Sequence, residues 1–73
     1  MERNGDLLQK FGVRLSEFRK NKGFTVGELA AAAGLEPAQI QKIEAGQLNF
    51  RLSTILALAE ALGISPAELM KSL

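Results

Sequence analysis

Four glycines divide this chain into short segments and limit what it can fold into. Each of Gly23, Gly34, Gly46 and Gly63 follows a stretch in which apolar residues recur at spacings of three and four. A helix commonly ends on a glycine in the left-handed conformation, which residues with a Cβ adopt only at a cost. The pattern therefore predicts four helix ends, and the intervals between them leave room only for short helices.

The expected helix starts carry signals of their own. Three segments fit the capping box, in which one side chain at the start of a helix and another three residues later bond free backbone N–H groups: Asp6-x-x-Gln9, Thr25-x-x-Glu28 and Ser65-x-x-Glu68. Pro37 and Pro66 suit the first turn of a helix, where a missing N–H costs no hydrogen bond.

These signals predict an all-α fold of five short helices in one domain over residues 1–73, with a short flexible N-terminus over residues 1–5. The fifth helix begins near Pro66, and the first four are expected over residues 6–22, 26–33, 37–45 and 52–62. Apolar residues at helical spacing predict the buried sides of the first and fourth helices: Leu7, Leu8, Phe11, Leu15 and Phe18, then Leu52, Ile55, Leu56, Ala59 and Leu62.

Length and composition argue against an enzyme. Seventy-three residues leave little room for a deep catalytic cleft, and the chain holds no histidine and no cysteine, which are common general bases and metal ligands. We therefore expect no catalysis, no metal and no cofactor. The longest apolar runs have five residues, against about 18 needed to cross a membrane, and the polar N-terminus lacks the apolar part of a signal peptide. A cytoplasmic protein is expected.

The charge is small but unevenly placed. The net charge is +1, yet residues 10–22 hold five basic residues and one acid, whereas residues 52–73 hold one basic residue and two acids. On charge alone a solvated helix face is the simpler interpretation of the basic segment, and a polyanionic partner is the alternative.

The connection between the second and third expected helices is more specific. Only Gly34, Leu35 and Glu36 join them. So short a connection requires a sharp corner between the helices, which is the geometry of a helix-turn-helix. The residues expected to point inward around this corner are apolar: Leu29, Ala30, Ala33, Leu35, Ile40 and Ile43. Those expected to point outward from the third helix are mostly polar: Glu36, Gln39, Gln41 and Lys42.

A set of residues across most of the chain shares a recognisable order and spacing: Phe11-Gly12, Leu15, Phe18-Arg19, Gly23-Phe24-Thr25, Glu28-Leu29-Ala30, Gly34-Leu35, Ile40, Ile43-Glu44, Gly46, Leu58-Ala59, Ala61-Leu62-Gly63 and Glu68-Leu69. Together they resemble the phage-repressor and Cro type of helix-turn-helix domain, also called the xenobiotic-response-element family of bacterial regulators. The resemblance implies a lambda-repressor-like DNA-binding domain whose third helix, from about Pro37 to Ala45, enters the major groove of double-stranded DNA.

The resemblance also implies which residues meet DNA. Thr25, and Asn49 and Arg51 in the loop over residues 46–51, are expected to contact phosphates, which positions the domain without reading sequence. Base reading falls to the start and outer face of the third helix: Glu36, Pro37, Ala38, Gln39, Gln41 and Lys42. Lysine can donate to guanine, glutamine can pair with adenine, glutamate can accept from cytosine, and small apolar side chains can touch a thymine methyl. The lysine and glutamines are equally ordinary residues of a solvated helix surface.

Arg19 and Glu44 match a pair that joins the first helix to the end of the third in this family, so we expect an ion pair between them. A carboxylate near DNA repels phosphates unless it is neutralised, and an arginine fork can hold a carboxylate in fixed geometry. The alternative is two independent surface charges, worth about 0–1 kcal/mol.

Three residues depart from the family pattern. Val26 stands where a glutamine usually binds a phosphate, Ala45 where a polar residue often precedes the glycine, and Arg51 where a small hydroxyl residue caps the fourth helix. Val26, Ala45 and also Ala38 place apolar atoms where DNA contacts are expected. They keep open a second interpretation, a domain of the same fold whose main partner is a protein, such as a toxin neutralised by an antitoxin-like chain.

Four apolar residues are not explained by the helical patterns, and they predict either a homodimer contact or further core beneath the fifth helix: Leu48, Phe50, Met70 and Leu73. One such domain covers only about 600–1,000 Å² on DNA, so specific operators are usually bound by dimers. The sequence therefore predicts a sequence-specific transcriptional regulator, a homodimer on a palindromic operator, located with the nucleoid in the cytoplasm and having no membrane partner.

Overall fold

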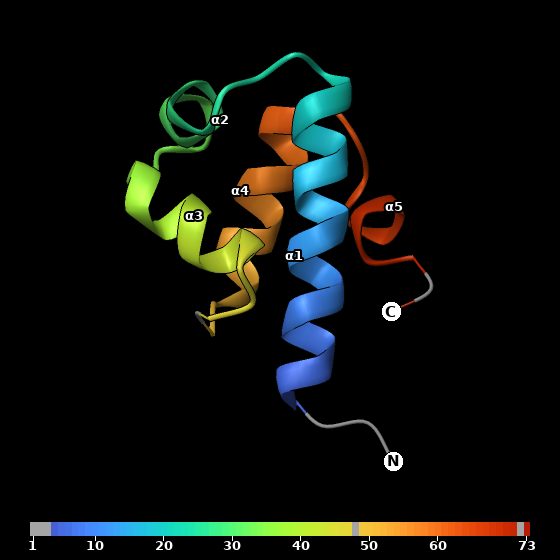
Figure 1. Cartoon of the computed structure of the whole chain (residues 1–73). Helices are drawn as coiled ribbons and strands as arrows, with labels where there is room; N and C mark the ends of the chain where they lie inside the picture. Colours follow the sequence, from blue (N-terminus) through green and yellow to red (C-terminus); the bar gives the residue numbers. More distant parts are fainter. Residues whose placement is uncertain (1–3, 48, 72) are drawn as a thin grey trace.

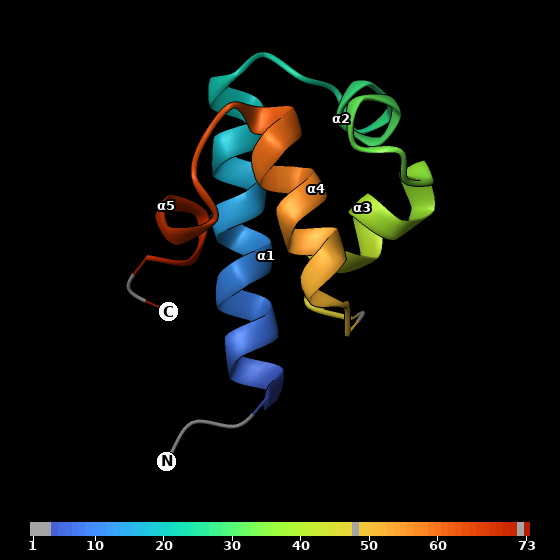
Figure 2. The same ribbon diagram turned by 180° about the vertical axis from the view of Figure 1, so that it is seen from behind.

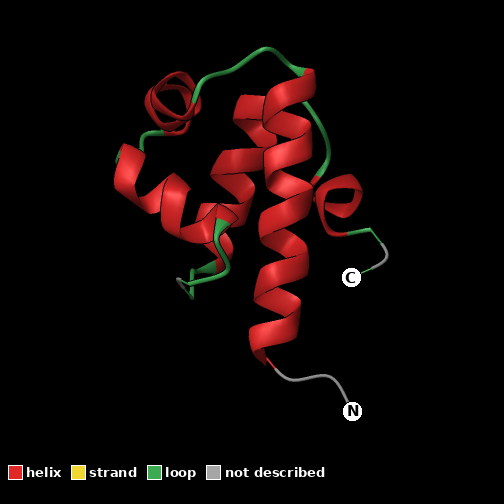
Figure 3. Cartoon of the chain, in the orientation of Figure 1, coloured by secondary structure: helices red, strands yellow, loops and turns green. Residues whose placement is uncertain are grey.

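The computed structural model describes residues 4–47, 49–71 and 73 of the chain. Within these ranges the chain forms helices joined by short loops and contains no strand (Figures 1 and 3). The helices are α1 Asn4–Asn21, α2 Val26–Ala33, α3 Pro37–Glu44, α4 Leu52–Leu62 and α5 Pro66–Met70. The predicted all-α fold of five short helices is confirmed.

The bounds of α2 and α4 are those that the sequence predicted, and those of α1 and α3 differ slightly. Both helices end one residue before the predicted position, at Asn21 and Glu44, and α1 begins at Asn4, two residues early. Asp6 thus lies inside the first turn of α1, where its charge suits the positive end of the helix dipole, and not at the cap. Of the five N-terminal residues predicted to be flexible, the last two are helical and the first three lie outside the described residues.

All four glycines expected to follow helices have left-handed backbone, with φ between 71° and 76°. The conformation matters most at Gly34, in the corner between α2 and α3. There the N–H of Leu35 donates to the carbonyl of Ala30 at 2.8 Å and satisfies a group at the end of α2. The chain can therefore reverse its direction within the three residues that separate the two helices.

Two of the expected capping interactions hold helix starts in place. At α2, Thr25 Oγ1 accepts from the Glu28 N–H at 3.1 Å and Glu28 Oε1 accepts from the Thr25 N–H at 2.8 Å, which completes a capping box. At α5, Ser65 Oγ accepts from the Glu68 N–H at 3.0 Å. Each bond satisfies a backbone donor that the helix itself leaves without a partner.

All five helices contribute side chains to one core. Its buried apolar residues are Phe11, Leu15, Leu29, Ala30, Ile40, Ile43, Leu58, Ala59, Leu62 and Leu69. Three residues predicted to be buried are not: Leu7 is 38% exposed, Leu52 is 70% exposed and Leu56 is 48% exposed. Leu7 lies near the start of α1, which extends beyond the other helices (Figure 1). Because α4 is apolar around most of its circumference, periodicity alone did not identify the side that meets α2 and α5.

Figures 1 and 2 show how the helices are arranged around α1. The pair α2 and α3 lies on one side of α1 and α5 lies on the other, with α4 packed between these groups. α3 contacts α1 and α2, so one side of it faces the core. No helix within the described ranges has the length and apolar character needed to cross a membrane.

α1 and α3 approach each other closely at Gly12, which is buried. A Cβ at this position would lie 2.5 Å from the carbonyl oxygen of Ile43 and 2.6 Å from that of Glu44. Both atoms belong to the backbone of α3, so they cannot move aside as a flexible side chain could. The missing side chain of Gly12 therefore sets the distance between α1 and the last turn of α3.

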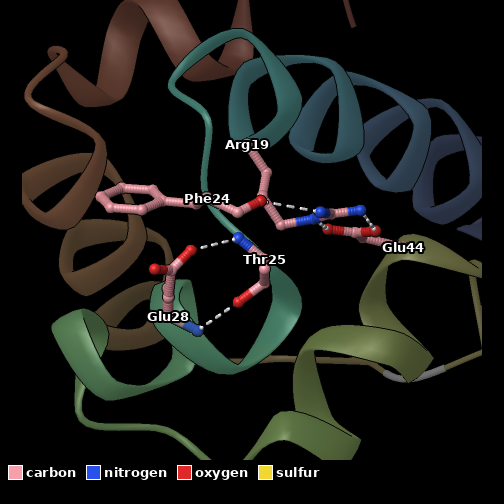
Figure 4. A network of polar contacts seen from close by, with 5 residues as sticks. All are labelled: Arg19, Phe24, Thr25, Glu28 and Glu44. Atoms are coloured by element: carbon pink, nitrogen blue, oxygen red, sulfur yellow. Dashed lines mark hydrogen bonds and ion pairs between the residues drawn. The ribbon is translucent and has the colours of Figure 1, made fainter.

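Arg19 makes the second connection between these helices (Figure 4). Its Nε donates to Glu44 Oε2 at 2.6 Å and its Nη2 donates to Glu44 Oε1 at 3.1 Å, with the two side chains 12% and 13% exposed. Its Nη1 donates to the carbonyl of Phe24 at 3.0 Å, just before α2. The hydrogen bond to Glu44 raises the pKa of the Arg19 guanidinium, against the opposing effect of burial. One charged side chain thus joins α1, the entry to α2 and the end of α3.

We predict that Gly12→Ala lowers the free energy of unfolding by about 1–3 kcal/mol, the usual cost of overpacking, although alanine is the better helix former by about 1 kcal/mol. The matched control is Gly5→Ala in the same helix, where a Cβ would meet no atom within 4 Å. Urea unfolding of both variants should show a loss for Gly12→Ala and no loss for Gly5→Ala. Equal stability of the two variants would contradict the close contact.

We predict that Arg19→Ala lowers the free energy of unfolding by about 3 kcal/mol, because it leaves the mostly buried Glu44 carboxylate without a compensating charge. Lys20→Ala, which removes an exposed charge from the next position, should change the stability by no more than about 0.5 kcal/mol. Chemical denaturation at neutral pH measures both. If Arg19→Ala behaves like Lys20→Ala, the two charges are independent of each other.

Candidate nucleic-acid interface

The side of α3 that faces away from the core is accessible along its length. Ile40 and Ile43 are buried, whereas five of the six predicted base-reading residues are exposed: Glu36, Pro37, Ala38, Gln41 and Lys42. The helix lies at the edge of the molecule in both Figure 1 and Figure 2. A helix with its side chains is about 10–12 Å across, and the major groove of B-DNA is about 12 Å wide. α3 is thus free to enter such a groove.

Gln39 differs from the other residues predicted to read bases. It is partly buried, and its Oε1 accepts from the N–H of Glu36 at 2.9 Å. The side chain therefore turns back to the start of α3 and fixes its first turn. Sequence reasoning missed this role because glutamate is an uncommon cap residue, although the spacing Glu36-x-x-Gln39 is that of a capping box.

Glu36 is exposed at the leading end of α3. Its carboxylate can accept hydrogen bonds from the N4 amino group of cytosine, but it repels phosphates. If α3 enters the groove, this side chain must consequently face bases and not the backbone.

One potential phosphate contact lies at the start of α2, where Thr25 is exposed. Its hydroxyl oxygen accepts from the backbone N–H of Glu28, and its hydroxyl hydrogen therefore remains able to donate to a phosphate. The N–H groups of Val26 and Gly27 in the first helical turn point the same way, as at any helix start. The nearby carboxylate of Glu28 opposes an anion here, so this contact is weaker than a helix start alone would suggest.

Asn49 and Arg51 form a second potential phosphate contact on another side of α3. Asn49 Oδ1 accepts from the N–H of Phe50 at 3.0 Å, so its amide NH₂ remains available as a donor. Arg51 is exposed at the N-cap of α4. Together with Gln39 they line a hollow of about 340 Å³ between α3 and the start of α4. The structure thus brings together three residues that the sequence had placed at the interface.

The apolar residues considered for a homodimer contact have different surroundings. The ring of Phe50 lies 4.8 Å from that of Phe11, measured between centroids, and both Phe50 and Leu73 pack against the core. Met70 is 39% exposed, and Leu48 lies outside the described residues. Phe50 and Leu73 therefore extend the core of the single chain.

This surface presents two cations, Lys42 and Arg51, that can attract an anion. Lys42 and Arg51 form no ion pair with the residues that the structure describes, so their charges face solvent. No group of three or more acidic, histidine or cysteine side chains in the described ranges is placed to hold a metal ion.

Comparisons with known proteins agree with this geometry. Residues 10–71 match a family described as the helix-turn-helix domain. The chain is 32% identical over 65 residues to an uncharacterised HTH-type transcriptional regulator, y4dJ, of Sinorhizobium fredii, and the match covers 89% of this chain and 84% of that protein.

Two similar solved structures are named as a controller protein and a gene regulator. The restriction-modification controller protein C.AhdI from Aeromonas hydrophila is 47% identical with a TM-score of 0.84, over 85% of this chain and 94% of that one. The clp gene regulator ClgR from Corynebacterium glutamicum is 31% identical with a TM-score of 0.84, over 88% of this chain and 82% of that one. With the corner at Gly34 and the exposed face of α3, these matches show that the chain belongs to the helix-turn-helix domain family.

Proposed function

We propose that the chain is a transcriptional regulator that binds double-stranded DNA by inserting α3 into the major groove, and that it acts as a homodimer on a palindromic operator. The observation that carries the proposal is the exposed face of α3. It lies between two groups of hydrogen-bond donors that can bind phosphates, one at Thr25 and one at Asn49 and Arg51. The names of y4dJ and ClgR as regulators and of C.AhdI as a controller protein support it.

Under this proposal the contacts divide between backbone and bases. Arg51, Asn49 and Thr25 hold phosphates, while Gln41 and Lys42 project from the exposed face of α3 toward base edges. On a duplex without its base partner, the Lys42 ammonium binds a phosphate instead. A good bidentate base contact contributes about 1–3 kcal/mol of discrimination. Two or three such contacts give one domain limited selectivity, which is why we include a second copy on the operator.

A protein partner is the second candidate function. Val26 no longer supports it, because this side chain packs against the core and is not a free apolar surface. Ala38 on α3 and Ala45 directly after it are exposed, and they still place apolar atoms where DNA contacts are expected. The same experiment separates the two functions, since a domain devoted to a protein partner has no salt-dependent affinity for DNA.

We predict that Lys42→Ala and Arg51→Ala each weaken binding to a random-sequence duplex and reduce its dependence on salt. The logarithm of the binding constant falls with the logarithm of salt concentration, with a slope of about −0.9 for each phosphate neutralised. Each variant should therefore lose up to about 0.9 from that slope, as measured by fluorescence anisotropy at several salt concentrations.

The control for this experiment is Lys71→Ala, which removes one exposed charge just after α5, on the far side of α1 from α3 (Figures 1 and 2). Its slope should remain that of the unaltered protein. If all three variants keep the full slope and affinity, the surface assigned here does not bind DNA.

The homodimer is the part of the proposal that needs a surface outside the core. Leu52 and Leu56 lie one turn apart on α4, and they are 70% and 48% exposed. Met70 adds a further partly exposed apolar side chain. We assign the contact between copies to the exposed side of α4, since large apolar side chains exposed next to each other commonly mark a protein contact.

We predict that sedimentation velocity shows a mass rising toward twice the 7.9 kDa of one chain as concentration increases. Leu56→Glu should keep the protein monomeric, because a charge cannot be buried in an apolar contact without a partner. Val13→Glu, another exposed apolar position but on α1, is the control and should leave association unchanged. If the unaltered chain sediments as a monomer at every concentration, the homodimer is contradicted.

A further inference from the structure

A second hollow lies beside α3, on the side that faces α1. It has a volume of about 490 Å³ and is lined by Ser16, Glu17 and Lys20 of α1 and by Gln41, Glu44 and Ala45 next to them. Gln41 is one of the exposed residues proposed to read bases. α3 is therefore bordered by one hollow that contains Arg51 and by another that contains Lys20.

Lys20 is the cation among the residues that line this hollow. The carboxylate of Glu44 is held by Arg19 and does not require a second cation. Lys20 is exposed and forms no ion pair with the residues that the structure describes. Glu17 is the remaining acid, but it also borders two hollows on the α5 side of α1, both of which contain Arg14. Glu17 thus lies on α1 between the side that faces α3 and the side that faces α5.

A helix in the major groove has a DNA backbone on each side of it, because the groove is scarcely wider than the helix. Arg51 and Asn49 supply cationic and neutral donors on one side. On the other side, the start of α2 offers the hydroxyl of Thr25 with the carboxylate of Glu28 beside it, and no basic side chain. A phosphate on this side therefore still lacks a cation.

We infer that Lys20 contacts a DNA phosphate on the α1 side of α3 and balances the contact that Arg51 makes on the other side. The inference rests on the proposed function and extends it to a residue that sequence reasoning had treated only as part of a basic segment. A lysine suits the role, since its ammonium is a compact charge on a flexible four-carbon stem that can reach from α1 to the backbone.

The test compares Lys20→Gln with Lys22→Gln on a random-sequence duplex over a range of salt concentrations. The two changes remove the same charge two residues apart, but Lys22 Nζ lies near Gly63 at the end of α4 and not beside α3. Lys20→Gln should reduce the salt slope by about 0.9, which corresponds to affinity about eightfold lower at 0.1 M salt and nearly equal affinity near 1 M. Lys22→Gln should leave the slope unchanged, and Lys20→Arg should retain it.

Thermal unfolding of each variant at the same midpoint as the unaltered protein verifies that the fold is intact. Equal changes in slope for Lys20→Gln and Lys22→Gln overturn the inference, since they would show only the effect of net charge. An unchanged slope for Lys20→Gln together with a reduced slope for Arg51→Ala also overturns it, while the proposed function stands. Unchanged slopes for Lys20→Gln, Lys42→Ala and Arg51→Ala reject the proposed function as well.

Discussion

The position of α3 depends on the bidentate contact between Arg19 and Glu44. This contact ties the last turn of α3 to α1, and the third hydrogen bond of Arg19, to Phe24, ties the same point to the entry of α2. Gly12 sets the distance at which the two helices meet. At the other end of α3, the bond between Gln39 and the backbone of Glu36 fixes the first turn. The helix is therefore held at both ends before any partner binds, and little ordering entropy has to be lost on binding.

The same contact has an electrostatic role. Glu44 borders the hollow beside Gln41, so a free carboxylate there would repel a polyanion approaching α3. Arg19 neutralises that charge, and it does so from within the domain, which leaves Lys42, Arg51 and Lys20 exposed to solvent. A protein with a net charge of only +1 can thus present a locally cationic surface, because what matters at close range is which charges already have partners.

The sequence predicted correctly those features of the fold that depend on interactions between neighbouring residues. The glycine ends, the capping box at Thr25 and the short corner at Gly34 depend on a few neighbouring residues, and they led to the correct bounds of α2 and α4. It was less informative where packing between distant segments decides. Leu52 and Leu56 have the spacing of core residues, but α2 and α5 cover a different side of α4. Gln39 and Lys20 each needed the structure, since an ordinary polar side chain on a helix shows its role only when its neighbours are known.

The central claim, that the exposed face of α3 meets DNA, is tested most directly by NMR. Amide signals of the isotopically labelled protein would be followed while a duplex is added at low salt. The account predicts that the largest shift changes fall at Ala38, Gln41 and Lys42, with further changes in the segment of Asn49 and Arg51. Changes confined to α5 and the part of α1 that faces it would contradict the account.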